Sequence, residues 1–291
     1  MEPSEISLGI SPCPNDTFIF YHLLHRKDLP FRLRPVIADV EQLNVMVLEG
    51  RLDVSKVSFG LAAKVAERYL ILESGSALGR GCGPLVLGAR RLAREELEGS
   101  VIAIPGTNTT AALLLQLYMG SGAAKLRPML FSRIPDAILQ GEVDAGVVIH
   151  ETRFTYREKG LVCLEDLGKW WEKKTQRPLP LGGIIARREL SSRVSGIIDR
   201  GIRESIEFAM AHPEETSGFV TSHAQEMSRG VQKKHIDLYV NEFSLALGRE
   251  GRDAVRQLFD LAVQSGACPV ALPDLPLFLA EQQERQEGNG K

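Results

Sequence analysis

The stretch that decides the fold is Leu139-Gln-Gly-Glu-Val-Asp-Ala-Gly-Val-Val-Ile-His150, in which a helix end passes through a glycine into a short apolar run. Such a run, bounded by turn residues, is typical of a buried strand. A near copy, Leu48-Glu-Gly-Arg-Leu-Asp-Val54, lies earlier in the chain. The two copies suggest two lobes built on one plan. The alternative is a chance recurrence of a common helix-turn-strand pattern.

Short apolar runs alternate with helical patterns around both copies, which predicts α/β lobes, each a mostly parallel sheet flanked by helices. From residue 188 onward the pattern is almost wholly helical. The expected strands are residues 6–10, 31–36, 54–57, 69–72, 84–88, 101–104, 128–131, 143–150 and 182–186. The expected helices are residues 17–25, 40–48, 109–119, 197–210, 213–222, 231–240 and 253–265.

The order of these elements predicts that the chain leaves its first lobe, builds a second, and returns. We therefore expect residues 1–86 and 188–291 to form lobe 1 and residues 87–187 to form lobe 2. A ligand cleft would lie between them, at the carboxyl ends of the strands. Closure of the two lobes could exclude water from a bound ligand.

Composition excludes several classes of protein. The 291 residues are 44% hydrophobic with a net charge of −2, and scattered basic residues give no nucleic-acid footprint. No apolar stretch is long enough for a membrane span, and the acidic start is unlike a secretory signal. The four cysteines form no C-x-x-C pair, so we expect reduced thiols in a cytoplasmic protein and no metal site. Nothing indicates the oligomeric state.

His150 is the candidate catalytic residue, because it ends a predicted strand and because an imidazole suits proton abstraction near neutral pH. The alternative is a histidine with only a structural role. Asn15 and Asp16, in the loop after the first strand, are expected at the same edge of the sheet. At least one of the two is expected to cap the following helix. His235 is expected among solvated helical residues.

A second candidate site is the turn Pro105-Gly-Thr-Asn-Thr-Thr-Ala111, which leads into an apolar helix. The backbone N–H groups and the hydroxyls of Thr109 and Thr110 would gather at the helix start, an arrangement that binds anions such as carboxylates. The alternative is a threonine cap alone. No Gly-Lys-Ser/Thr follows, so the turn is not a nucleoside triphosphate loop.

Four motifs together resemble the 1,4-dihydroxy-6-naphthoate synthase family of the futalosine route to menaquinone. They are the Ser-Pro-Cys-Pro-Asn-Asp-Thr-Phe start, the Pro-Gly-x-x-Thr-Thr-Ala turn, the Ile-His-Glu-x-Arg-Phe-Thr-Tyr segment and Leu-Pro-Leu-Gly-Gly. The resemblance covers essentially the whole chain. It implies a type II periplasmic-binding-protein-like fold used as an enzyme.

The resemblance also implies a reaction and a set of site residues. Cyclic dehypoxanthinyl futalosine would become 1,4-dihydroxy-6-naphthoate with release of dihydroxyacetone, without a cofactor. The family's histidine base corresponds to His150, and its substrate-contacting segments correspond to Lys56-Val57-Ser58 and to Thr109-Thr110. The partner implied is a small-molecule carboxylate. The direction of the Lys56 side chain stays open, because neighbouring strand residues face opposite ways.

Three other functions fit parts of the sequence. A chorismate dehydratase-like enzyme of the same pathway would share the fold, but we do not expect it to carry the Ile-His-Glu segment. A non-catalytic small-carboxylate-binding protein would normally have a signal peptide or a lipid anchor. A regulator's effector-binding lobe would carry a helix-turn-helix segment.

Overall fold

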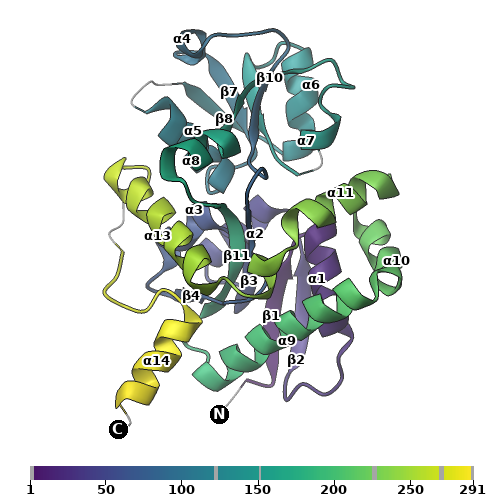
Figure 1. Cartoon of the computed structure of the whole chain (residues 1–291), viewed down its shortest axis with the longest axis vertical. Helices are drawn as coiled ribbons and strands as arrows, with labels where there is room; N and C mark the ends of the chain where they lie inside the picture. The colour runs from purple at the N-terminus through teal and green to yellow at the C-terminus, as the bar shows by residue number, and fades with distance from the viewer. Residues whose placement is uncertain (1–2, 121–123, 151, 225–227, 269–271, 290–291) are drawn as a thin grey trace.

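The computed structural model describes residues 3–120, 124–150, 152–224, 228–268 and 272–289. Figure 1 shows two α/β lobes one above the other, with the chain crossing between them at the waist. Within the described residues, six strands form one sheet and five form the other. The expected α/β class with a sheet in each lobe is confirmed.

The first sheet, in the lower lobe of Figure 1, has the order β2-β1-β3-β11-β4, with β5 paired to β11. Strand β1 runs parallel to β2 and β3, whereas β11 is antiparallel to β3, β4 and β5. The strands are β1 (Glu5–Ile10), β2 (Arg32–Ile37), β3 (Val54–Ser58), β4 (Tyr69–Ile71), β5 (Ala77–Gly79) and β11 (Leu179–Arg187).

The second sheet has the order β10-β6-β9-β7-β8. Strand β7 is parallel to β8 and β9, whereas β6 is antiparallel to β9 and β10. The strands are β6 (Leu85–Gly88), β7 (Val101–Ile104), β8 (Lys125–Pro128), β9 (Ala145–Val148) and β10 (Val162–Asp166).

Both sheets are mixed rather than mostly parallel, and this corrects the prediction. The difference arises at β6 and β11, the strands that follow the two crossings, because each enters its sheet antiparallel to a central strand. Strand β11 also pairs within the first sheet, although the predicted boundaries placed all of it in lobe 2. We keep the two-lobe division as a proposal, with residues 179–187 moved to lobe 1.

The two copies of the repeated sequence adopt the same local structure. Gly50 and Gly141 follow helix ends with φ of 69° and 71°, a left-handed conformation that favours glycine. The aspartate before each strand then accepts a backbone N–H bond from the neighbouring parallel strand. Asp53 accepts from the N–H of Ser7 in β1 (2.9 Å), and Asp144 accepts from the N–H of Val101, the first residue of β7 (2.8 Å).

The helices cover both sheets, and α9 shows why the pattern folds this way. Its residues Val194, Ile198, Ile202 and Ile206 recur every four positions and are fully buried, which makes one face of the helix apolar. The helices are α1 (Pro14–His25), α2 (Val40–Leu48), α3 (Phe59–Ala62), α4 (Arg94–Leu97), α5 (Thr110–Met119), α6 (Ile134–Leu139), α7 (Thr152–Thr155), α8 (Leu167–Thr175), α9 (Ser192–Ala211), α10 (Pro213–His223), α11 (Arg229–Tyr239), α12 (Glu242–Leu245), α13 (Gly248–Gln264) and α14 (Leu279–Asn289).

Two predicted strands differ from the structure. The strand expected at residues 128–131 is wrong, since β8 ends at Pro128 and a 3-10 turn begins at Phe131. Strand β8 is an edge strand of mostly exposed polar residues. The apolar residues 129–131 that follow it therefore resemble a buried strand more closely than β8 itself does. The strand expected at 143–150 is shorter, because β9 covers only Ala145–Val148.

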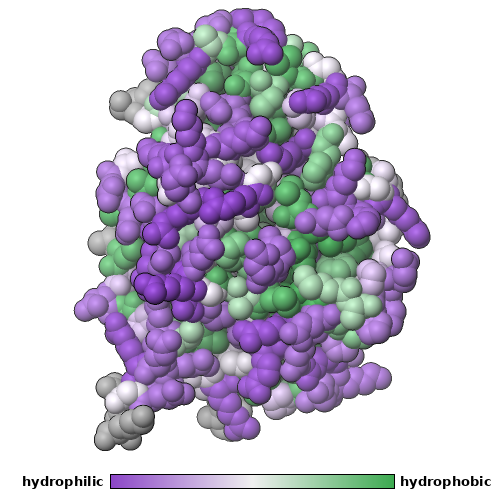
Figure 2. All heavy atoms as spheres, viewed as in Figure 1, coloured by the Kyte–Doolittle hydropathy of each residue, from purple (hydrophilic) through white to green (hydrophobic). Residues whose placement is uncertain are grey.

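In the described part of the chain, no helix combines the length and the apolar character that crossing a membrane requires. Polar side chains dominate the face shown in Figure 2, with apolar ones in small groups among them.

Candidate active site

A cavity lies between the two sheets and is lined by residues of both lobes. The structure brings together here every residue that the sequence predicted for the site. They are Asn15, Asp16, Lys56, Val57, Ser58, Thr109, Thr110 and His150.

His150 lies two residues beyond the end of β9, with a φ of 57°. Few residues other than glycine adopt this conformation, and such positions concentrate at functional sites. The ring packs edge-on against Phe131 with the centroids 4.8 Å apart. The sulfur of Cys13, from the other lobe, is 3.4 Å from Nδ1. His150 is therefore held from both sides of the cleft. Glu151, which follows it, lies outside the described residues.

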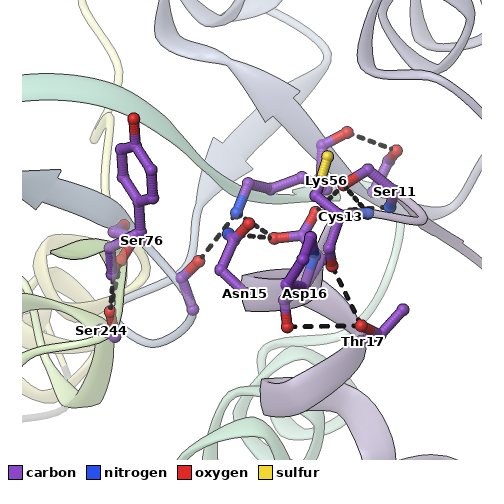
Figure 3. Close-up of polar contacts among 12 residues, drawn as sticks. Ser11, Cys13, Asn15, Asp16, Thr17, Lys56, Ser76 and Ser244 are labelled. Atoms are coloured by element: carbon purple, nitrogen blue, oxygen red, sulfur yellow. Dashed lines mark hydrogen bonds and ion pairs between the residues drawn. The ribbon is translucent and has the colours of Figure 1, made fainter. Parts of the chain in front are cut away.

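Asp16 is the centre of a buried polar network (Figure 3). Its Oδ2 accepts a hydrogen bond from the hydroxyl of Ser11 (2.6 Å). Its Oδ1 accepts from the Asn15 amide (2.9 Å) and from the Lys56 ammonium (2.6 Å). The Lys56 and Asp16 side chains are only 7% and 1% exposed, so this ion pair is shielded from solvent.

Neither Asn15 nor Asp16 caps helix α1, contrary to the prediction. The helix begins at Pro14, with Cys13 in the N-cap position. Proline is favoured at the first helical position, because its missing N–H costs nothing there. Both polar residues therefore fall within the first turn, and their side chains are directed to the cavity network.

Lys56 points into the cavity, which answers the question that the sequence left open. Lys56 and Ser58 lie on one side of β3, and Val57 lies on the other, with its side chain in the hydrophobic core. Val57 therefore borders the cavity through its backbone, between two polar neighbours.

His235, from helix α11, also reaches this cavity, although the sequence placed it among solvated residues. It is 1% exposed, and its Nε2 is 2.9 Å from Asn15 Oδ1. Because the Asn15 amide donates to Asp16, the Asn15 oxygen must accept, and Nε2 of His235 therefore carries the proton. Burial holds the pKa of His235 well below its usual range, with further lowering by His150 and Lys56.

The hydrogen bonds around Ser58 fix the direction in which its hydroxyl can donate. Asn44 is fully buried and accepts the Ser58 N–H (3.0 Å), while its amide donates to Ser58 Oγ (3.3 Å). Since Oγ accepts this hydrogen bond, its own proton is available to donate into the cavity. An anion or a carbonyl oxygen would suit this position.

The start of helix α5 offers backbone donors, whereas its two threonine hydroxyls are engaged. Thr109 is the N-cap, and its oxygen accepts from the N–H of Ala112 (3.2 Å). Thr110 Oγ1 donates to the carbonyl of Leu181 (2.6 Å) and accepts from the N–H of Gly60 (3.0 Å). Thr110 and Ala111, the first two helical residues, line the cavity, and their N–H groups have no intrahelical partner.

Polar contacts between the lobes close one side of the cleft. Glu41, from α2, accepts hydrogen bonds from the backbone N–H (3.1 Å) and the side-chain amide (3.0 Å) of Asn108. Its other oxygen accepts from Asn44, the residue that holds Ser58. The side-chain amide of Asn44 therefore connects this contact between the lobes to Ser58 in the cavity.

His235 and Tyr239, from helix α11, are among the cavity residues that the sequence did not predict. They lie four positions apart, so they share one face of α11, and their rings pack with centroids 4.7 Å apart. This i, i+4 spacing of His235 and Tyr239 was the sequence feature that could have indicated a shared buried face. The rest of the helix is rich in charged residues, which is why the sequence predicts a solvated position for His235.

Comparison with known proteins finds relatives that match nearly the whole chain. The model of a family described as menaquinone biosynthesis matches residues 6–264. A protein of Thermus thermophilus named "1,4-dihydroxy-6-naphtoate synthase" is 49% identical over 94% of this chain and 99% of its own length. One of Streptomyces coelicolor with the same name is 42% identical over 96% of this chain and 100% of its own length.

Two solved structures share the fold. A protein of Archaeoglobus fulgidus is 34% identical with a TM-score of 0.86, covering 91% of this chain and 98% of that one. The alkanesulfonate-binding protein of Xanthomonas axonopodis is 15% identical with a TM-score of 0.69, covering 93% and 96%. The expected periplasmic-binding-protein-like fold is confirmed, and the chain belongs to the menaquinone biosynthesis family.

Proposed function

We propose that this protein is a lyase that converts cyclic dehypoxanthinyl futalosine to 1,4-dihydroxy-6-naphthoate and dihydroxyacetone in the cytoplasm. The observation that carries the proposal is the near full-length identity to two relatives named for this product. The cavity adds a physical reason, since a histidine in a rare backbone conformation faces a network of polar groups there.

The donors at the α5 start suit the substrate carboxylate. The N–H groups of Thr110 and Ala111 lie at the positive end of a ten-residue helix, and Ser58 adds a hydroxyl donor. Thr109 and Thr110 then contribute backbone and shape rather than their hydroxyls. The carboxylate would sit here, which leaves the reacting part of the substrate toward His150.

His150 acts as the general base. It accepts a proton from the bicyclic substrate, the carbon–carbon bond to the sugar-derived fragment breaks as in a retro-aldol reaction, and the electron pair passes to the carbonyl-bearing fragment. Return of the proton completes a redox-neutral step, and aromatisation of the ring drives it. A positioned base typically contributes about 10²–10⁴-fold, and closure of the cleft adds orientation and exclusion of water.

The test is incubation of the purified protein with cyclic dehypoxanthinyl futalosine, followed by the absorbance of the naphthoate and by mass spectrometry of both products. Product that increases with protein concentration is the expected result. Saturable binding of the substrate without turnover would reject the lyase and identify a binding protein instead.

A further inference from the structure

The turn before helix α5 is held by two side chains of the other lobe. Asn108, from this turn, donates its side-chain amide to Glu41 of α2 (3.0 Å), and its amide oxygen accepts from Lys64 (3.3 Å). The backbone N–H of Asn108 also donates to Glu41 (3.1 Å). Glu41 and Lys64 both belong to the lobe of the first sheet, whereas Asn108 follows β7 of the second sheet. The Asn108 side chain is therefore bonded at both of its ends to the opposite lobe.

Gly106, in the same turn, leaves room for the Glu41 side chain. Its φ is 146°, a conformation that residues with a side chain rarely adopt. A Cβ at this position would lie 2.4 Å from both Cγ and Cδ of Glu41. The turn and the carboxylate are thus fitted to each other where the two lobes meet.

The second oxygen of Glu41 is bonded to the residue that orients Ser58. Oε2 accepts from the Asn44 amide (3.0 Å), and the same amide donates to Ser58 Oγ (3.3 Å). An amide nitrogen carries two N–H groups, so one is directed to each of these acceptors. The Asn44 oxygen accepts from the Ser58 N–H (3.0 Å), which fixes the orientation of the amide. Asn44 is fully buried, so these hydrogen bonds are shielded from solvent.

We propose that Glu41 is a positioning residue that couples contact between the lobes to the hydroxyl donor of Ser58. With the lobes in contact, one oxygen of Glu41 is held by the Asn108 turn and the other holds Asn44. Asn44 then donates to Ser58 Oγ, which leaves the Ser58 proton to donate to the substrate. Separation of the lobes removes the donors of the turn, and the Glu41 carboxylate can then rotate away from Asn44. The inference rests on the proposed function in one respect, namely that Ser58 donates to the substrate carboxylate.

The neutral amide of Asn44 allows a carboxylate to support an anion site. A Glu41 charge directly beside a substrate carboxylate would repel it. Asn44 instead presents one N–H to Glu41 and one to Ser58, so the two negative groups are separated by a donor. Glu41 also bonds the residue just before the N-cap of α5, where the helix dipole stabilises a negative charge. Its charge therefore favours contact between the lobes.

Small-angle X-ray scattering without ligand tests the contact between the lobes, so the result does not depend on the reaction. Glu41→Gln replaces one of two acceptor oxygens by a donor, and Asn108→Asp places a second carboxylate against Glu41. Both variants should have a larger radius of gyration than the wild type. Asn108→Ala, which only removes the side-chain bonds, is the second variant if Asn108→Asp does not fold. Glu49→Gln, at the exposed end of the same helix, is the control and should match the wild type.

A double-mutant cycle tests whether Glu41 acts through Ser58. Calorimetry gives the dissociation constant of 1,4-dihydroxy-6-naphthoate, the product of the proposed reaction. Ser58→Ala removes a donor to a charged group and should weaken binding about 10- to 100-fold. Glu41→Gln should weaken binding about 3- to 10-fold in the wild-type protein, but less than about 2-fold in the Ser58→Ala background. A residue with only a general structural role would have the same effect in both.

Three results would overturn the inference. Equal radii of gyration in the wild type and the folded variants would show that Glu41 does not hold the lobes together. Equal effects of Glu41→Gln in both backgrounds would show that it acts independently of Ser58. Binding unchanged by Glu41→Gln would show that the contact between the lobes does not reach the site. If the wild type neither turns over the substrate nor binds the naphthoate, the proposed function fails, and scattering still decides the role of Glu41 between the lobes.

Discussion

Replacement of Lys56 by methionine should reveal how strongly the cavity depends on its buried ion pair. The side chains have similar volume, but methionine carries no charge. In the variant, Asp16 keeps its carboxylate with the side chain 1% exposed and loses the cation 2.6 Å away. Removing one partner of a buried pair typically costs about 3–5 kcal/mol, because the remaining charge stays desolvated.

A paired variant shows where that cost arises. In Lys56→Met combined with Asp16→Asn, the asparagine oxygen can still accept from Asn15, and its amide can donate to Ser11 Oγ. No buried charge remains, so most of the loss should be recovered, to within about 2 kcal/mol of the wild type. An exposed pair on α11 is the control: Lys233→Met should cost less than about 1 kcal/mol.

The assay is urea-induced unfolding followed by circular dichroism, with thermal unfolding in parallel. Lys56→Met should lower the melting temperature by roughly 10 °C, at about 2–4 °C per kcal/mol for a chain of this size. A loss no larger than that of Lys233→Met would refute the reasoning. So would a double variant that is no more stable than Lys56→Met alone.

Three further perturbations follow from the site and its supports. Gly60→Ala should destabilise the fold by about 1–3 kcal/mol and raise KM, since the new Cβ would lie 2.9 Å from the Thr109 carbonyl. Gly218→Ala, in open space within α10, is the control and should be neutral or stabilising. Unfolding and kinetic measurements on both variants check this. Thr110→Val removes both hydroxyl bonds and should weaken substrate binding by displacing the α5 start, while Thr110→Ser keeps them; equal KM values would contradict this account. Burial raises the pKa of Cys82 to about 12, so iodoacetamide at pH 8 should label it only after unfolding, as peptide mapping would show.

Local patterns predicted the repeated units and the position of His150 close to the end of a strand. The structural roles of Gly141 and Asp144 follow from residue type and position in the chain. A left-handed turn favours glycine, and an aspartate can accept a hydrogen bond from a neighbouring strand. The same holds for Asp39, which caps helix α2 by accepting the N–H of Glu41, because aspartate is favoured at the N-cap. These features depend on neighbours along the chain, so a single sequence displays them.

What the sequence did not predict depends on contacts between distant segments. Asp16 was one of two predicted helix caps, but in the structure it is the centre of a polar network that includes the Lys56 ammonium, forty residues later. His235 lies 220 residues from Asn15, so no local sequence pattern predicts the hydrogen bond between them. The antiparallel entries of β6 and β11 likewise depend on how the chain crosses between lobes, which periodicity alone does not report.

The most direct test of the central claim is the turnover of His150→Ala with cyclic dehypoxanthinyl futalosine, measured beside its substrate affinity. Loss of the base should reduce kcat by about 10²–10⁴-fold, while the dissociation constant of the substrate and the unfolding midpoint stay close to those of the wild type. Naphthoate formation at the wild-type rate would contradict the claim that His150 takes the substrate proton.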